Sequence, residues 1–251
     1  MWGNQRLHRA KECNKGITKR CNMLTRKTLS LYVPVIVAFL LILSGCATSS
    51  STSSSGGIKA GPGVDTTNKT ITLGILSPYS GPVADPIGIP LANGVKAYFD
   101  HINDNGGIDG YKVKFSEQDT QYNPQLEVQK YNQIHNQVLM IADSLGTPTT
   151  FAIKDQATAD HMLVSAATLS SALAREKYLI LVGTPYRLQV ENAFDYIVNK
   201  LSVKNPSTGI IYQDDEYGQD GLTGYKEAKS AYNLHDVAQV TYAATDTDFT
   251  A

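Results

Sequence analysis

Along most of the chain, apolar residues recur either at every second position, as in a strand, or at every third or fourth position, as in a helix. Residues 70–76, TITLGIL, combine alternation with β-branched side chains, which predicts a strand. Further on, apolar residues stand four, seven, eight and eleven positions after Leu91, on one face of a helix. This helix should end at Asn105-Gly106, because glycine readily takes the left-handed conformation that terminates many helices. The Pro- and Gly-rich residues 77–90 between them are expected to form a loop.

The same patterns repeat to the end of the chain. Strands are predicted at residues 70–76, 112–119, 138–145, 162–165, 178–182, 209–212 and 237–242. Helices are predicted at residues 91–102, 124–134, 149–160, 190–201 and 217–232. Strands that alternate with helices at this spacing indicate an α/β fold with parallel sheets covered by helices.

We expect these units to form two lobes. The first lobe should span residues 70–184, and residues 185–251 should begin a second one. After Pro206 the pattern offers only a strand, a helix and a strand, which would bury too little apolar surface to stand alone. We therefore expect the second lobe to be incomplete and the sequence to be truncated.

An apolar run near the N-terminus indicates an export signal. Residues 31–43, LYVPVIVAFLLIL, are uncharged and follow a basic stretch. This run is interrupted by Pro34 and is shorter than the roughly 20 residues that a helix needs to cross a bilayer, so the pattern favours a signal peptide over a permanent anchor. Translation from Met23 would give such a peptide an ordinary basic start, which is our expectation for the natural initiation site.

The residues after this run, Leu43-Ser44-Gly45-Cys46, resemble the bacterial lipoprotein box. The resemblance implies a signal peptide over residues 1–45, cleavage before Cys46, and diacylation of that cysteine. Two acyl chains are the number that gives stable attachment to a membrane. The alternative is a free cysteine in an ordinary signal peptide or anchor helix.

Residues 46–69 are dominated by serine, threonine and glycine. Such a composition buries too little apolar surface to offset the entropy of ordering the chain, so a flexible tether is expected here. By chain statistics its root-mean-square reach would be about 27 Å. The N-terminal quarter therefore predicts export, a lipid anchor and a domain held near the membrane.

Charge and cysteine content exclude several classes of function. After residue 45 the chain carries 14 Lys and Arg residues against 22 Asp and Glu residues, which argues against nucleic acid as a partner. No cysteine follows Cys46, so the predicted domain has neither a disulfide framework nor a thiolate metal site. The 14 tyrosines are notable, because tyrosine offers small ligands both an apolar face and a polar tip, although most of them are expected to be ordinary half-buried packing residues.

Five stretches in order along the chain together resemble the branched-chain amino acid type of ABC-transporter solute-binding lipoprotein. They are residues 71–84 (ITLGILSPYSGPVA), 102–115 (INDNGGIDGYKVKF), 145–150 (LGTPTT), 164–168 (VSAAT) and 210–222 (IIYQDDEYGQDGL). The resemblance implies a type I periplasmic-binding-protein fold, in which two α/β lobes close on a small ligand. It also implies an ABC permease and its ATPase subunits as partners, and a lipid-anchored position on the extracytoplasmic face of the cell membrane.

Two turns are candidate ligand contacts in the first lobe. In open parallel sheets ligands bind beyond the carboxyl ends of the strands, where LGTPTT and SAAT are expected to lie as turns. Thr149 and Thr150 would open a helix whose free N–H groups favour a carboxylate, although threonine commonly serves there as a plain cap. By resemblance, Ala166 and Thr168 would contact the ligand through backbone and hydroxyl groups.

The resemblance assigns one further contact and shows two departures. Tyr217 matches a second-lobe aromatic residue that lies against the ligand, although it could equally pack against its own helix. Asp85-Pro86 stands where amino-acid binders often place an aromatic residue, and Val182-Gly183-Thr184 replaces the usual Arg-Thr. The expected ligand is therefore a small polar solute: a branched-chain or other amino acid, or a related amide.

The sequence offers little support for enzymatic chemistry. It contains no common nucleotide-binding, zinc-protease or serine-hydrolase motif, so neither catalytic residues nor a cofactor are expected. The scattered histidines are best explained as surface residues, and Asp214-Asp215-Glu216 as a solvated edge without the spacing of a calcium loop. Two alternatives from other classes are a tethered sensor domain that signals on ligand closure and a membrane-anchored hydrolase.

Overall fold

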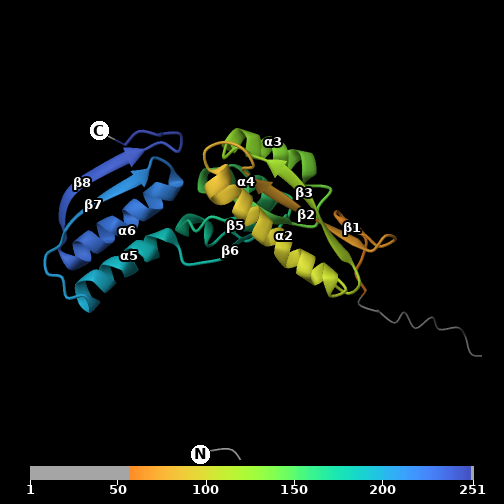
Figure 1. The fold of residues 1–251 in the computed structure, drawn as a ribbon, viewed down its shortest axis with the longest axis horizontal. Coiled ribbons are helices and arrows are strands. Elements are labelled where there is room, and N and C mark those ends of the chain that lie inside the picture. Colours follow the sequence, from red (N-terminus) through yellow and green to blue (C-terminus); the bar gives the residue numbers. More distant parts are fainter. Residues whose placement is uncertain (1–56, 250–251) are drawn as a thin grey trace, which may run out of the picture. The chain divides into compact units, whose positions relative to one another are not determined.

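The computed structural model of the chain describes residues 57–249 (Figure 1). The predicted signal peptide, Cys46 and the first part of the predicted tether lie outside these residues. Within residues 57–249, no helix combines the length and the apolar character that crossing a membrane requires.

The first sheet contains six strands. Five of them run parallel, in the order β3-β2-β4-β5-β6, with β1 pairing antiparallel to the start of β2. The strands are β1 (Val64–Asp65), β2 (Thr70–Ser77), β3 (Lys112–Asp119), β4 (Ile141–Leu145), β5 (Val164–Ala167) and β6 (Leu179–Leu181). The predicted parallel sheet is confirmed, and its only antiparallel strand among the described residues is β1.

The strand β1 lies in the segment for which the composition predicts a tether. Asp65 accepts hydrogen bonds from the backbone N–H groups of Thr67 and Asn68, both at 2.9 Å, which closes a tight turn into β2. Val64 then pairs with Ile71. Ordered structure therefore begins before the expected boundary at Thr70, because a local aspartate turn and strand pairing supply the backbone with partners.

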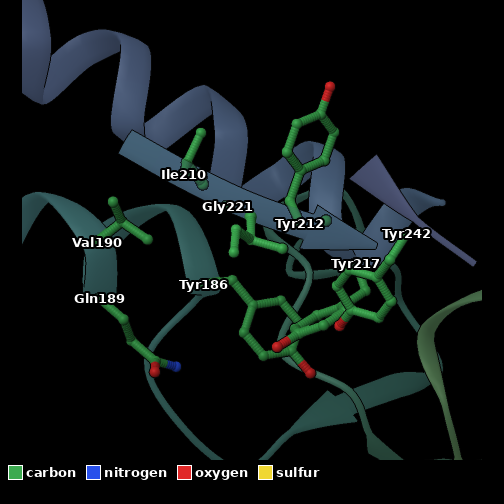
Figure 2. A pocket seen from close by; sticks show the side chains of 10 residues that line it. Tyr186, Gln189, Val190, Ile210, Tyr212, Tyr217, Gly221 and Tyr242 are labelled. Carbon is green, nitrogen blue, oxygen red and sulfur yellow. The ribbon is translucent and has the colours of Figure 1, made fainter. Parts of the chain in front are cut away.

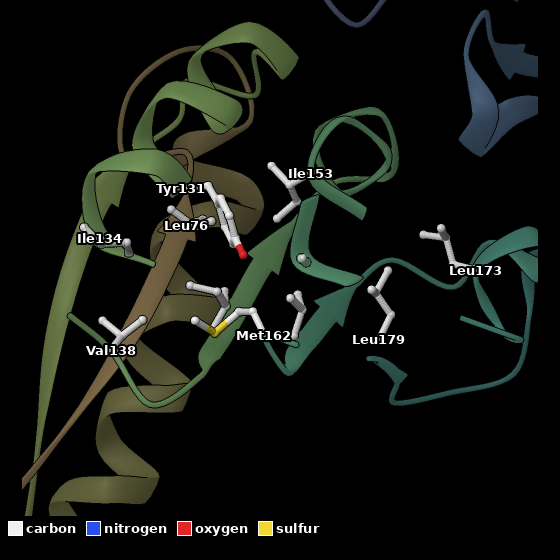
Figure 3. Packing of buried hydrophobic residues seen from close by; sticks show 11 residues of the cluster. Leu76, Tyr131, Ile134, Val138, Ile153, Met162, Leu173 and Leu179 are labelled. Atoms are coloured by element: carbon white, nitrogen blue, oxygen red, sulfur yellow. The ribbon is translucent and has the colours of Figure 1, made fainter. Parts of the chain in front are cut away.

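Helices cover the first sheet on both faces. They are η1 (Ala84–Gly88), α2 (Ile89–Asp104), α3 (Pro124–Ile134), α4 (Thr147–Ala159) and η2 (Ser171–Leu173). On one face, Leu76 packs with Tyr131 of α3 and Ile153 of α4 in the larger core cluster (Figure 3). On the other face, Ile71 and Leu73 pack with partly buried residues that include Phe99 of α2. Successive strand residues point to opposite faces, so β2 contributes to both clusters.

Some element boundaries differ from the predicted ones. The predicted loop 77–90 contains η1, and α2 begins at Ile89 with Pro90 in its first turn. The helix α4 begins at Thr147 rather than at Thr149, because Pro148 suits a first helical turn, where its missing N–H costs no bond. The strand β5 extends to Ala167, so SAAT is largely strand rather than turn.

A second, two-stranded sheet forms from the C-terminal residues. Its strands β7 (Ser207–Gln213) and β8 (His235–Tyr242) are parallel, and α6 (Glu216–Tyr232) connects them. The helix α5 (Tyr186–Asp195), continued by η3 (Tyr196–Lys200), packs against α6. Their backbones approach so closely at Gly224 that an added Cβ would lie 2.3 Å from the carbonyl oxygen of Arg187.

Candidate ligand-binding site

A cavity of about 420 Å³ lies at the carboxyl ends of the strands of both sheets. This volume falls within the range of small-molecule sites, and the position is where open parallel sheets bind ligands. Its lining consists of Val83, Ile87, Leu91, Tyr122, Leu145, Gly146, Thr147, Ala167, Tyr186, Gln213, Tyr217, Tyr242, Ala243, Ala244 and Asp246. Most of these side chains are aliphatic or tyrosine.

The turn between β4 and α4 forms part of the cavity wall in the first lobe. Gly146 has φ 114°, a conformation that disfavours any side chain, and a Cβ there would lie 2.6 Å from the ring of Tyr122. Tyr122 itself has φ 56°, which is unusual for a bulky residue. The tyrosine ring thus lies directly against the glycine, in a backbone conformation that the surrounding structure must enforce.

The tyrosines at the cavity come from four separate elements. Tyr122 precedes α3, Tyr186 begins α5, Tyr217 lies in the first turn of α6, and Tyr242 ends β8. The rings of Tyr186 and Tyr217 meet edge to face with centroids 4.8 Å apart. Figure 2 shows Tyr186, Tyr217 and Tyr242 gathered, beside a smaller pocket of about 280 Å³ that α5 and β7 also line.

Local hydrogen bonds fix the second-lobe side of the cavity. The carboxylate of Asp215 caps α6 by accepting from the N–H groups of Tyr217 at 2.9 Å and Gly218 at 3.1 Å. Gln213, at the end of β7, donates to the hydroxyl of Tyr122 at 3.4 Å. Desolvation by burial raises the pKa of Tyr122 to about 12 and also raises the pKa of Tyr217, so both phenols are protonated at neutral pH.

Thr149 and Thr150 do not line the cavity. Both are fully buried, and their hydroxyl groups are engaged within the first lobe. Thr149 donates to the carbonyl oxygen of Leu145 at 2.6 Å, and Thr150 Oγ1 lies 2.9 Å from Ser144 Oγ. Thr147, two residues earlier, lines the cavity instead because α4 begins there. Ligand contact by Thr149 and Thr150 stays a prediction.

The second predicted turn shows a similar displacement. Ala166 is a buried residue within β5, and its neighbour Ala167 lines the cavity. The hydroxyl of Thr168 lies 2.6 Å from that of Thr147. Thr168 therefore forms a hydrogen bond with a lining residue but does not line the cavity itself. Among the five predicted ligand contacts, Tyr217 alone belongs to the lining.

Sequence reasoning missed three of the four lining tyrosines, namely Tyr122, Tyr186 and Tyr242. The high tyrosine content was a signal for a role in ligand contact, but it did not say which tyrosines would meet. These tyrosines are far apart in the sequence and come together only in the folded chain. Tyr242 is the last residue of β8 and Tyr122 lies in the short loop between β3 and α3, so a search for aromatic residues at and just beyond strand ends would have found both.

Two acidic side chains, Glu127 of α3 and Asp143 of β4, are buried in the first lobe. Glu127 of α3 accepts a hydrogen bond from Ser144 at 2.8 Å, and one of its carboxyl oxygens has no partner. Burial raises the pKa of Glu127 to about 8, and the nearby Asp143 adds to this effect. Burial also raises the pKa of Asp143 to about 7. At neutral pH the Glu127 carboxyl therefore carries a proton in most molecules.

Contacts between the end of the first lobe and α6 position the second lobe's elements. The carboxylate of Asp220 accepts from the N–H of Ser171 at 3.1 Å and from the N–H of Arg187 at 3.2 Å. The Ser171 hydroxyl donates to the same carboxylate. In the part of the chain that the structure describes, no three His, Cys, Asp or Glu side chains are grouped so as to hold a metal ion.

Comparison with known proteins identifies the family. A family model described as "Periplasmic binding protein" matches residues 70–251. The chain belongs to this family. No curated protein sequence matched the chain significantly.

Solved structures of other periplasmic binding proteins share this fold. A fatty acid ABC transporter substrate-binding protein from Thermomonospora curvata is 31% identical, with a TM-score of 0.72 over 77% of this chain and 49% of that one. A possible leucine/isoleucine/valine-binding protein from Rhodopirellula baltica is 22% identical, with a TM-score of 0.62 over 75% and 51% of the two chains.

A third structure was solved with a ligand. It is a branched-chain amino acid transporter substrate-binding protein from Streptococcus pneumoniae in complex with isoleucine, 24% identical, with a TM-score of 0.59 over 72% and 52% of the two chains. This periplasmic binding protein therefore spans about half the length of the solved structures that it matches.

Proposed function

We propose that this chain is the extracytoplasmic, lipid-anchored solute-binding component of an ABC importer. It captures a small solute, such as an amino acid or a related amide, between two lobes and delivers it to a membrane permease whose ATPase is a separate chain. Binding involves no chemical change of the solute. Cys46 carries the lipid, and residues between it and the domain act as the tether.

The cavity at the strand ends is the observation that carries this proposal. Its lining comes from the first lobe through residues such as Tyr122 and Thr147, and from the second through residues such as Tyr217 and Tyr242. A ligand that contacts both groups favours the arrangement in which they face each other, because only that arrangement makes both sets of contacts. Family membership supports a solute-binding role, and the names of the solved relatives support a permease as the partner.

Filling the cavity tests the proposal. Ala243 is exposed and lines the cavity, so Ala243→Trp should obstruct it while the fold is retained. We expect solutes that raise the melting temperature of the wild type, drawn from amino acids, short amides and fatty acids, to lose at least tenfold in affinity with this variant. Ala231→Trp, at an exposed position of α6, is the matched control and should bind as the wild type does. Equal affinity in both variants would contradict the proposed site.

Attachment is tested separately. The chain expressed from its natural start should partition with the membrane fraction and carry label from radioactive palmitate. The Cys46→Ser variant should carry no label. Label that persists in this variant would contradict the anchor without affecting the solute-binding proposal.

A further inference from the structure

We propose that Glu127 is a positioning residue for the cavity: its protonated carboxyl holds the β4–α4 turn in the shape that lines the cavity. This inference rests on the proposed function and deepens it, because it makes solute affinity depend on the protonation of one group outside the lining. The Glu127 side chain is fully buried, so its surroundings are supplied by the described residues themselves. The argument starts at the turn and leads back to the carboxyl.

The cavity wall between β4 and α4 is closed into a compact loop. Residues 145–147 of this turn all line the cavity. Ser144 and Thr150 lie on either side of them in the sequence, and their hydroxyl oxygens are 2.9 Å apart. The N–H of Thr150 also donates to the carbonyl oxygen of Gly146 at 3.0 Å. The shape of the wall therefore depends on where the Ser144 and Thr150 side chains are held.

Glu127 connects these two hydroxyl groups to α3. Ser144 Oγ donates its single proton to Glu127 Oε1 at 2.8 Å, so toward Thr150 it can only accept. Thr150 Oγ1 accordingly donates to Ser144 Oγ, at 2.9 Å, in preference to the Ser144 carbonyl oxygen at 3.2 Å. The result is one directed chain of hydrogen bonds, Thr150 to Ser144 to Glu127, among three buried side chains. In such a buried chain, a change at one end is felt along its length.

The start of α3 contacts the turn a second time through Tyr122. This tyrosine lies just before the N-cap residue Asn123, and its ring is so close to Gly146 that an added Cβ there would lie 2.6 Å away. The N–H of Glu127 donates to the carbonyl oxygen of Asn123 at 2.9 Å, which ties the two contacts to one helical turn. A shift of this turn would therefore move both a lining tyrosine and the hydrogen-bonded chain.

The surroundings of the carboxyl favour its protonated form. Burial raises the pKa of Glu127 to about 8, the hydroxyl groups of Ser144 and Thr120 lower it, and the carboxyl of Asp143 raises it further. Glu127 Oε2 and Thr120 Oγ1 are both buried without a hydrogen-bond partner. A negative charge on this carboxyl would be costly to keep in the interior. We expect ionisation to displace the first turn of α3 toward water, and with it the support of the cavity wall.

Other titratable groups on the elements that pack against α3 act elsewhere. These elements are β2, β3 and α4, and β2 has no titratable side chain. Glu117 pairs with Lys96, Asp119 accepts from Ser80 Oγ at 2.6 Å, and Lys154 pairs with Asp155. Lys112 donates to the carbonyl oxygen of Asn103, and Lys114 acts on Asp65. Among the described residues, Asp143 of β4 is thus the titratable group that acts on the pKa of Glu127.

Methyl NMR of the chain tests the positioning role without any solute. In protein labelled with ¹³C at the threonine methyl groups, the Thr147 and Thr150 signals should shift with a common midpoint near pH 8. Labelling the glutamate carboxyl carbons should give the same midpoint for Glu127 itself. Glu127→Gln cannot ionise, so both threonine signals should stop responding to pH in this range. The exposed Glu216→Gln is the matched control and should keep the wild-type response.

Two further variants separate positioning from stability alone. Ser144→Ala interrupts the chain but leaves Glu127 able to ionise, so Thr147 should lose most of its shift while the carboxyl signal still titrates. Asp143→Asn removes a neighbouring charge, so every midpoint should move to lower pH. A Thr147 signal that does not respond to pH in the wild type, or that keeps its full shift in Ser144→Ala, would overturn the proposal.

Solute binding should follow the same proton. Leucine is the probe, because its charge stays nearly constant between pH 6.5 and pH 8.5. Calorimetric titration should find its affinity about two- to fourfold weaker at pH 8.5 than at pH 6.5, which is the range that a pKa of about 8 allows. Glu127→Gln should bind equally at both pH values, with the wild-type affinity of pH 6.5. By linkage, saturating leucine should raise the midpoint of the Glu127 carboxyl signal.

The outcomes distinguish this inference from the proposed function. Failure of leucine to bind at either pH, with the threonine signals shifting as expected, counts against leucine as the solute and supports Glu127 as a positioning residue of the wall. Equal leucine affinity at both pH values in the wild type would overturn the link between Glu127 and solute binding. Leucine binding without any threonine shift would overturn the inference and leave the solute-binding function standing.

Discussion

The two sheets of this protein differ in how their faces are covered. The first sheet has helices on both sides and two core clusters, and its strand β2 is almost entirely buried. The β7–β8 sheet packs α6 on one side and leaves apolar side chains such as Ile211 and Val237 exposed on its strands, at 70% and 60%. The same strand-and-helix alternation therefore produces a fully covered sheet in one region and a partly covered one in the other.

This difference affects what each region brings to the cavity. In the first lobe, the hydroxyls of Thr149 and Thr150 form hydrogen bonds within the lobe itself. The second contributes half-buried or exposed tyrosines, among them Tyr217 and Tyr242. Of the four tyrosines that line the cavity, Tyr122 thus belongs to the more covered region and the other three to the less covered one.

The largest expected effect compares one isoleucine from each sheet region. Ile153→Ala removes a fully buried side chain from the larger core cluster, so it should lower the free energy of unfolding by about 2 to 5 kcal/mol. Ile211→Ala, at a 70% exposed position on β7, should change it by no more than about 0.5 kcal/mol. Urea unfolding followed by circular dichroism measures both, and similar losses would show that the two sheets are equally covered.

The buried acid of the first lobe gives a dependence on pH. Because burial raises the pKa of Glu127 from 4.5 to about 8, the folded state holds this proton more tightly than the unfolded state does. Stability should therefore be fully present below about pH 4.5 and should fall as the pH rises toward 8, by at most about 1.4 kcal/mol per unit.

The Glu127→Gln variant cannot lose a proton, so its stability should fall less over this range. The difference between wild type and variant should grow from pH 5 to pH 8 in urea unfolding. Glu216→Gln, at an exposed position in the first turn of α6, is the control and should run parallel to the wild type. A constant difference for Glu127→Gln would mean that this carboxyl ionises normally in the folded protein.

A smaller effect is expected at the turn beside Tyr122. Gly146→Ala introduces a Cβ 2.6 Å from the tyrosine ring at φ 114°, so we expect a loss of about 1 to 3 kcal/mol in unfolding free energy and weaker solute binding. Gly110→Ala shares a positive φ, 82°, but its Cβ would meet nothing within 4 Å. Gly110→Ala should therefore lose only the unfolding free energy that backbone strain costs. Equal losses in both variants would show that the contact with Tyr122 contributes nothing to the effect of Gly146→Ala.

The smallest predicted effect separates lining threonines from supporting ones. Thr147→Val removes a hydroxyl at the cavity, and we expect it to weaken solute binding about fivefold, which corresponds to about 1 kcal/mol. Thr149→Val removes a buried hydrogen bond to the carbonyl oxygen of Leu145, so it should lower stability by about 1 kcal/mol with little change in affinity. The reverse pattern would restore Thr149 as the ligand contact that the sequence predicts.

Periodicity was sufficient to predict most of the fold. The predicted strand 112–119 matches β3 in every residue, and the helix predicted to open at Pro124 and to carry Ile134 is α3. The helix has clear local signals: Pro124 opens it, and the side chain of Asn123 caps it by accepting from the N–H of Leu126 at 2.9 Å. The predicted ends were less accurate for elements whose ends depend on tertiary contacts. The end of β5 moved because Ala166 and Ala167 pair with β4, which no local pattern encodes.

The candidate site was predictable in position but only partly in its residues. The rule that ligands bind beyond strand ends pointed to the turns after β4 and β5, and the cavity touches both at Gly146 and Ala167. The particular side chains were displaced by one or two residues. Thr147 and Thr149 are both buried, but only Thr147 lines the cavity, so an error of two residues at a helix start changes which threonine is assigned to the site.

Amide hydrogen exchange, with and without a saturating solute that stabilises the chain, tests the location of binding most directly. Bound solute should slow exchange at residues 145–147, 213–218 and 242–246, which come from both lobes and border the cavity, while exchange at the distant turn 65–69 should not change. Protection confined to one lobe, or found away from the strand ends, would contradict capture of a solute between the two lobes.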